Sequence, residues 1–107
     1  MSVVGIGTDI IEIARLEKMS TAAFDKLARR VLTPNEYQHF LQLKYPVPYL
    51  AKRWAAKEAA AKALGTGIAA GVSFQHMEIQ SLASGQPQLI LSEVALARAH
   101  AISGNCW

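Results

Sequence analysis

The sequence has few of the residues that disulfide-bonded and metal-binding proteins need: it has one cysteine, Cys106, and three scattered histidines. A single cysteine excludes a disulfide framework within one chain and a cysteine-rich zinc site, and the histidines lack the spacing of a metal cluster. No apolar run reaches the roughly 18 residues of a membrane helix. The N-terminus lacks the basic region of a signal peptide, and Asp9 interrupts its apolar stretch. We therefore expect a soluble, reduced, cytoplasmic domain with no membrane partner.

Charged residues are also scarce, at 18% of the chain, while 51% of the residues are hydrophobic. This composition excludes a disordered chain. The net charge of +3 is too small by itself to indicate a nucleic-acid partner. A length of 107 residues suits one hydrophobic core, so we expect a single domain over residues 1–107.

The basic residues are concentrated in one segment, residues 44–62, where five of them accompany a single carboxylate, Glu58. They are Lys44, Lys52, Arg53, Lys57 and Lys62. A local positive field of this kind suits an anionic ligand such as phosphate. A lysine-rich helix face in contact with water explains the same pattern, so charge alone leaves both interpretations open.

Local signals predict a mixed α+β domain. The run Thr33-Pro34-Asn35-Glu36 combines a capping threonine, a proline at the first helical position and a glutamate that can reach back to the cap, which predicts a helix to about Leu43. Pro48 can open an alanine-rich helix that ends at Gly65. Further helices are expected from Asp9 toward Met19, over 22–31, and from Glu93, capped by Ser92, to about Ile102 with Gly104 ending it; strands are expected over 3–7, 72–82 and 88–91.

Two carboxylates are candidates for chemistry. At about 100° per residue, Leu50, Trp54 and Ala61 form an apolar stripe on the helix that Pro48 opens, and Glu58 lies at its edge. A carboxylate beside a buried face needs a partner, and Lys62, four residues later, can supply one. Asp9 can cap a helix. Brought together, Asp9 and Glu58 would instead form a hard-oxygen site for Mg²⁺ and a substrate phosphate.

Two further groups of residues have both a structural and a functional interpretation. Gly65-Thr66-Gly67 can be a helix C-cap and turn, or a loop that lets a ligand approach the backbone closely. A second basic set, which includes Arg15 and Arg30 and has Met19 nearby, can be simply solvated or can receive an acidic protein partner.

Two motifs together resemble a known family. They are Gly-Ile-Gly-Thr-Asp-Ile over residues 5–10 and Arg-Trp-Ala-Ala-Lys-Glu-Ala-Ala-Ala-Lys-Ala-Leu-Gly-Thr-Gly-Ile over residues 53–68. This pair resembles the bacterial holo-[acyl-carrier-protein] synthases, the small single-domain branch of the 4′-phosphopantetheinyl transferases. The resemblance extends from about Val3 to Ile102. It implies a long central helix packed on a small antiparallel sheet.

The resemblance also implies a reaction and its participants. The family moves the 4′-phosphopantetheine arm of coenzyme A to a serine of apo acyl carrier protein and releases adenosine 3′,5′-bisphosphate. It implies that Asp9 and Glu58 bind Mg²⁺, and that Lys62 neutralises the pyrophosphate. Arg53 would lie near the adenosine-side phosphates. The remaining roles are coenzyme-pocket lining for Gly65, Thr66 and Gly67, and carrier-protein binding for Arg15, Met19 and Arg30. The family is homotrimeric, with sites between subunits.

The chain departs from the family pattern after residue 104. Family members continue there into a His-x-Ser strand and a final apolar strand, so we expect one or two sheet strands and a coenzyme contact to have no counterpart here. An alternative is therefore a non-catalytic module that keeps only the carrier-protein or coenzyme surface. A small RNA-binding domain is the third possibility, but the strands lack the aromatic stacking pattern of such modules.

Overall fold

The computed structural model describes residues 13–106, and of residues 103–106 it describes the backbone alone. The expected strand over 3–7 and the expected helix cap at Asp9 lie outside these residues. The chain divides into two compact units, Met1–Ala55 and Ala56–Trp107. Each unit is described by itself below.

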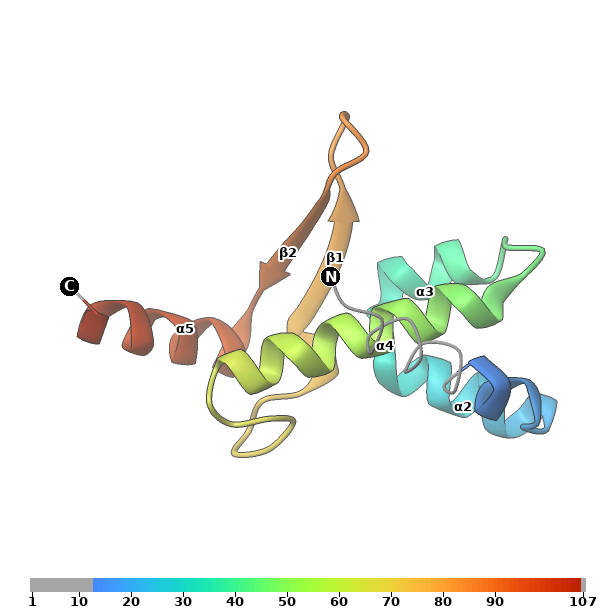
Figure 1. Ribbon diagram of the computed structural model, residues 1–107, viewed down its shortest axis with the longest axis horizontal. Helices are drawn as coiled ribbons and strands as arrows, with labels where there is room; N and C mark the ends of the chain where they lie inside the picture. The colour runs from blue at the N-terminus through green and yellow to red at the C-terminus, as the bar shows by residue number, and fades with distance from the viewer. Residues whose placement is uncertain (1–12, 107) are drawn as a thin grey trace. The chain divides into compact units, whose positions relative to one another are not determined.

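The first unit is helical (Figure 1). Residues 13–17 are helical, followed by α2 (Thr21–Val31), α3 (Pro34–Phe40) and the first half of α4 (Pro46–Ala63). The buried side chains of this unit are apolar with few exceptions, and Phe40 contacts the rings of Phe24, Tyr37 and Tyr49 at centroid distances of 5.7, 5.7 and 6.4 Å. Aromatic pairs at these distances contribute beyond their buried area, so this cluster helps to hold α2, α3 and α4 in one unit.

The predicted capping box is confirmed at the start of α3. The Thr33 hydroxyl accepts a hydrogen bond from the Glu36 N–H at 3.3 Å, and the Glu36 carboxylate accepts one from the Thr33 N–H at 2.9 Å. The helix ends at Phe40 rather than at Leu43, because the N–H groups of Gln42 and Leu43 bond to carbonyls only three residues back. This tighter pattern is typical of a helix end.

Helix α4 has 18 residues and begins at Pro46, two residues before the predicted start at Pro48. Both prolines fit the first turn of a helix, where the N–H that proline lacks would have no intrahelical partner. The earlier start therefore costs no hydrogen bond.

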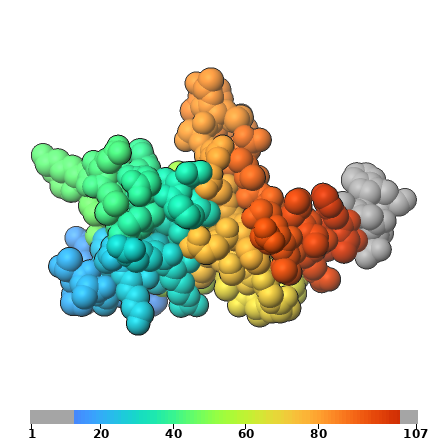
Figure 2. Space-filling model, turned by 180° about the vertical axis from the view of Figure 1, so that it is seen from behind, coloured from blue at the N-terminus to red at the C-terminus, as the bar shows by residue number. Residues whose placement is uncertain are grey.

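The second unit contains the end of α4, the short 3₁₀ helix η1 (Phe74–His76), strands β1 (Met77–Ser81) and β2 (Pro87–Leu91), and α5 (Glu93–Cys106). The strands form an antiparallel hairpin with Met77 opposite Leu91 and Ser81 opposite Pro87. Its tip, orange in Figure 2, stands clear of the rest of this unit. The core consists of Ala61, Leu64, Val72, Met77 and Ala95, so the end of α4 packs against the start of the hairpin, as expected for this α+β fold.

Two boundaries in this unit differ from the prediction by more than one residue. Strand β1 begins at Met77, not at residue 72, because Ser73 and His76 form a local capping box that bends residues 74–76 into η1. Helix α5 continues through Gly104 to Cys106. A glycine costs a helix only about 1 kcal/mol relative to alanine, so it does not have to end one. The Ser92 hydroxyl, predicted to cap α5, donates to the His76 carbonyl at 3.4 Å.

Candidate functional site

Glu58 and Lys62 are exposed on α4, in the second unit. The pairing that their spacing allows is not formed: within residues 13–106, no ion pair joins Glu58 to Lys62. The edge of the apolar stripe is therefore open to solvent at Glu58, and the carboxylate needs no buried partner there. Its oxygens are the hard donors that Mg²⁺ prefers.

Gly65, Thr66 and Gly67 form the C-terminal cap of α4. The N–H of Gly65 bonds to the Lys62 carbonyl at 2.9 Å, and that of Gly67 to the Ala61 carbonyl at 3.0 Å. Gly65 and Gly67 have φ values of +83° and +61°, a region that glycine enters without a steric penalty. The structural interpretation of this loop is thus confirmed, and its role in lining a coenzyme pocket stays a prediction.

A side chain that the sequence did not single out holds this cap. The Nε of Arg98, on α5, donates to the Leu64 carbonyl at 2.9 Å, and a Cβ on Gly65 would lie 3.2 Å from an Nη of Arg98. The Thr66 hydroxyl donates to the Gly67 carbonyl at 2.7 Å. The end of α4 therefore has a defined exit direction. No local sequence signal indicates the contact, because its partners are 34 residues apart.

Lys57 is completely buried, and its Nζ donates to the Phe74 carbonyl at 3.4 Å. Lys57 is therefore neither solvated nor facing a ligand. This corrects its grouping with the other basic residues of segment 44–62, which was based on charge alone. The sequence contained the signal: Leu50, Trp54, Lys57 and Ala61 follow the 4-3-4 spacing of one helix face. Lys57 lies inside the apolar stripe, whereas Glu58 lies at its edge.

Arg53 is in the first unit, and its side chain contacts two residues that no sequence motif links to it. Its Nε lies 3.6 Å from the Glu36 Oε2, and its guanidinium carbon lies 4.5 Å from the centre of the Tyr49 ring. The arginine side chain is 22% exposed and the glutamate 2%. The guanidinium of Arg53 thus lies beside a buried carboxylate and over an aromatic ring, at the margin of the unit.

The three residues predicted to bind a carrier protein, Arg15, Met19 and Arg30, also lie in the first unit. Arg15 and Arg30 are exposed and Met19 is half-buried. Arg29, next to Arg30, forms an ion pair with Asp25 at 2.8 Å. A hydrogen bond from the Tyr37 hydroxyl, and then one from Arg29, lowers the pKa of the Asp25 carboxyl below its ordinary value of 3.8. Arg29, the basic residue beside Arg30, is therefore engaged within α2.

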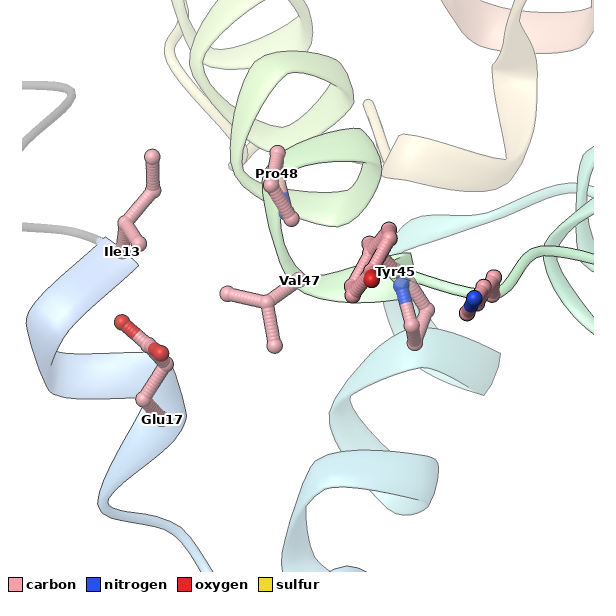
Figure 3. Close-up of a pocket in the computed structure, with 7 residues that line it drawn as sticks. Ile13, Glu17, Tyr45, Val47 and Pro48 are labelled. Atoms are coloured by element: carbon pink, nitrogen blue, oxygen red, sulfur yellow. The ribbon is translucent and has the colours of Figure 1, made fainter.

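The first unit also has a mostly apolar hollow of about 280 Å³. It lies between the helical residues 13–17 and the start of α4 (Figure 3). Ile13, Val47 and Pro48 line it, with Glu17 and Lys44 as its charged residues. None of the described residues predicted for the functional site lines this hollow, so it adds nothing to that site.

Asp9 lies outside the described residues, so its pairing with Glu58 stays a prediction. Within the part of the chain that the structure describes, no three His, Cys, Asp or Glu side chains gather as metal ligands do. Over the same residues, no helix combines the length and apolar character needed to cross a bilayer.

Comparison with known proteins places these features in a family. The model of the 4′-phosphopantetheinyl transferase superfamily matches residues 5–104. The chain is 56% identical to the holo-[acyl-carrier-protein] synthase of Shewanella frigidimarina, over 98% of this chain and 83% of that protein. It is 50% identical to the Yersinia enterocolitica enzyme of the same name, over 89% of this chain and 75% of that one.

Solved structures agree with the sequence relatives. Holo-[acyl-carrier-protein] synthase from Neisseria meningitidis superposes with a TM-score of 0.73 at 41% identity, over 87% of this chain and 74% of that one. The Bacillus anthracis enzyme, solved in complex with coenzyme A (3′,5′-ADP), gives a TM-score of 0.65 at 40% identity, over 77% and 70%.

The chain belongs to the 4′-phosphopantetheinyl transferase superfamily. Within that superfamily its relatives are the holo-[acyl-carrier-protein] synthases. It spans 83% of the length of the Shewanella frigidimarina protein, which agrees with the prediction that it is shorter than the family pattern.

Proposed function

We propose that the chain transfers the 4′-phosphopantetheine arm of coenzyme A to a serine of apo acyl carrier protein. The serine oxygen forms a bond to the phosphorus that bears the pantetheine arm, the pyrophosphate bond breaks, and adenosine 3′,5′-bisphosphate leaves as the serine loses its proton. The observation behind this proposal is the exposed Glu58 one turn before Lys62 and the glycine cap, all on the end of one helix. The Bacillus anthracis relative, in complex with coenzyme A, supports the choice of donor.

Asp9 and Glu58 would hold a Mg²⁺ ion in this reaction. The donor chemistry fits, because Mg²⁺ takes one or two carboxylates together with substrate phosphates, and Glu58 presents an exposed carboxylate. When bound, the ion would supply positive charge at the pyrophosphate and polarise the phosphorus.

The other residues proposed for the site act by charge and position. Phosphoryl-type transfer depends on positioning and charge neutralisation more than on covalent help from the protein. Lys62, exposed on α4, would neutralise the pyrophosphate, and Arg53 would meet a phosphate on the adenosine side. The Gly65-Thr66-Gly67 loop would line the coenzyme pocket, where its lack of bulky side chains allows a close approach.

Arg15, Met19 and Arg30 would receive the carrier protein. Two exposed arginines and a half-buried methionine suit an acidic helix, since opposite charges speed encounter and an apolar side chain adds contact area. We also propose a cytoplasmic homotrimer, as the family resemblance implies.

The direct test is incubation of the purified chain with coenzyme A, Mg²⁺ and apo acyl carrier protein, followed by mass spectrometry of the carrier protein. We expect a mass gain equal to one phosphopantetheine group, abolished when a chelator removes Mg²⁺. A folded chain that binds coenzyme A in titration calorimetry but gives no mass gain would support the alternative, a non-catalytic binding module.

A further inference from the structure

Glu36 contacts two different groups with its two carboxylate oxygens. Oε1 accepts the Thr33 N–H at 2.9 Å and closes the capping box of α3, while Oε2 lies 3.6 Å from the Nε of Arg53 on α4. The carboxylate is almost fully buried, at 2% exposure. A buried carboxylate is costly without a cation or hydrogen-bond donors, so the location of Glu36 favours a fixed Arg53 beside it.

Tyr49 restrains the same guanidinium from another side. It precedes Arg53 by one turn of α4, and the guanidinium carbon lies 4.5 Å from the centre of its ring. The Tyr49 hydroxyl in turn donates to the Glu36 backbone carbonyl at 3.4 Å. The Arg53 guanidinium therefore has the Glu36 carboxylate beside its edge, in an ion pair longer than a hydrogen bond, and the Tyr49 ring against its face. Glu36 and Tyr49 are themselves joined by the hydrogen bond from the Tyr49 hydroxyl.

We infer that Glu36 and Tyr49 are positioning residues that set the orientation of Arg53 toward a phosphate of coenzyme A. The inference rests on the proposed function, in which Arg53 meets a phosphate on the adenosine side. An arginine whose side chain is ordered before the ligand binds loses less conformational entropy on binding, and the affinity is therefore higher. Glu36 thus orients Arg53 in addition to capping the start of α3.

Glu36→Gln separates the capping of α3 from the orientation of Arg53. Glutamine at this position can still accept the Thr33 N–H, because a capping box takes either residue, but it carries no charge to hold Arg53. Fixing one long side chain is worth a few-fold in affinity, so we expect the Kd for coenzyme A, measured by titration calorimetry with Mg²⁺, to rise about 3- to 10-fold. Steady-state kinetics should show a raised KM for coenzyme A, with kcat and the KM for the carrier protein unchanged.

A double-mutant cycle tests whether Glu36 acts through Arg53. Arg53→Ala alone is expected to weaken coenzyme A binding about 10-fold or more, as loss of a charged hydrogen-bond donor does. Adding Glu36→Gln to Arg53→Ala should change the Kd no further, since the group that Glu36 positions is gone. Tyr49→Leu should weaken binding in the same direction as Glu36→Gln, and Tyr49→Phe, which keeps the ring, should restore most of the affinity.

Asp25→Asn is the matched control, because it makes the same carboxylate-to-amide change in the same unit and removes the ion pair with Arg29. It should leave the Kd for coenzyme A unchanged. The inference is overturned if Glu36→Gln has no effect, tightens binding, or weakens it equally in the Arg53→Ala background. If the unmodified chain neither binds coenzyme A nor transfers its arm, the proposed function is wrong, and this inference, which rests on it, is wrong as well.

Discussion

The Nε of Arg98 donates a hydrogen bond to the Leu64 carbonyl at 2.9 Å, which joins α5 to the last turn of α4. A carbonyl at a helix C-terminus has no intrahelical partner, and a cation there also interacts favourably with the helix dipole. The bond therefore stabilises the helix end from which the Gly65-Thr66-Gly67 loop leaves.

Gly65→Ala and Gly67→Ala should differ because of this contact. Both residues have positive φ, at +83° and +61°, so alanine at either position should lower the free energy of unfolding by about 1–2 kcal/mol. At Gly65 the new Cβ would also lie 3.2 Å from an Nη of Arg98, whereas at Gly67 no atom lies within 4 Å. We expect Gly65→Ala to cost up to about 1 kcal/mol more, the value of one hydrogen bond. Urea denaturation measures the difference, and a difference that persists in an Arg98→Ala background would contradict this explanation.

Lys57→Ala should destabilise the chain far more than other lysine substitutions on α4. The side chain is fully buried and its Nζ donates to the Phe74 carbonyl, so alanine leaves both a cavity and a lost donor. We expect the free energy of unfolding to fall by about 2–4 kcal/mol. Lys52→Ala, on an exposed position of the same helix, should stay within about 0.5 kcal/mol of the unmodified chain. Equal effects in chemical denaturation would show that Lys57 is solvated in solution.

Asp25 should make stability depend on pH in the acid range. The hydrogen bonds from Tyr37 and Arg29 lower its pKa in the folded chain below 3.8, so the unfolded state binds a proton more readily than the folded state. The stabilisation is thus fully present above the unfolded pKa and is lost as the pH falls through the folded pKa. Tm measured over this range should fall less steeply for Asp25→Asn than for the unmodified chain. Parallel curves would contradict the assignment.

Arg15→Glu and Arg30→Glu test the surface proposed for the carrier protein. Each reverses an exposed charge, so we expect the KM for apo acyl carrier protein to rise while the KM for coenzyme A stays constant. Because charge steering is screened by salt, the effect should shrink as ionic strength increases. A rise that is equal for both substrates would indicate a general loss of folded enzyme instead.

Local signals in the sequence predicted the helices α2, α3 and α4 to within about three residues at their ends, because the capping residues lie close to these ends. Thr33 and Glu36 are the clearest case: the capping box could be read directly and is present. The strand expected from residue 72 was too long, since alternating apolar residues do not reveal that Ser73 and His76 form a turn with each other.

Some contacts of α4 can be predicted from the sequence and others cannot. The burial of Lys57 could have been predicted from helical spacing, although a charged side chain usually lies at the surface. The partners of Arg53 and Arg98 could not be predicted, because Glu36 and Leu64 are distant in sequence and meet them only through packing. The exposure of Glu58 follows from its place at the edge of the apolar stripe.

Glu58→Gln tests the proposed metal site with the smallest change of shape. The side chain is exposed and forms no ion pair with Lys62 in residues 13–106, so we expect Tm to stay within about 2 °C, as for other surface substitutions. Transfer of phosphopantetheine should fall at least about 100-fold. Loss of a residue that only supports a metal ligand already costs up to about 100-fold, and Glu58 is proposed to bind the metal directly. Asp9→Asn should behave alike, and isothermal titration with Mg²⁺ in the presence of coenzyme A should show weaker metal binding for both variants. Unchanged transfer by either folded variant would refute the assignment. A neutral amide holds Mg²⁺ less tightly than a carboxylate does, so less of the cation's positive charge would be available at the pyrophosphate.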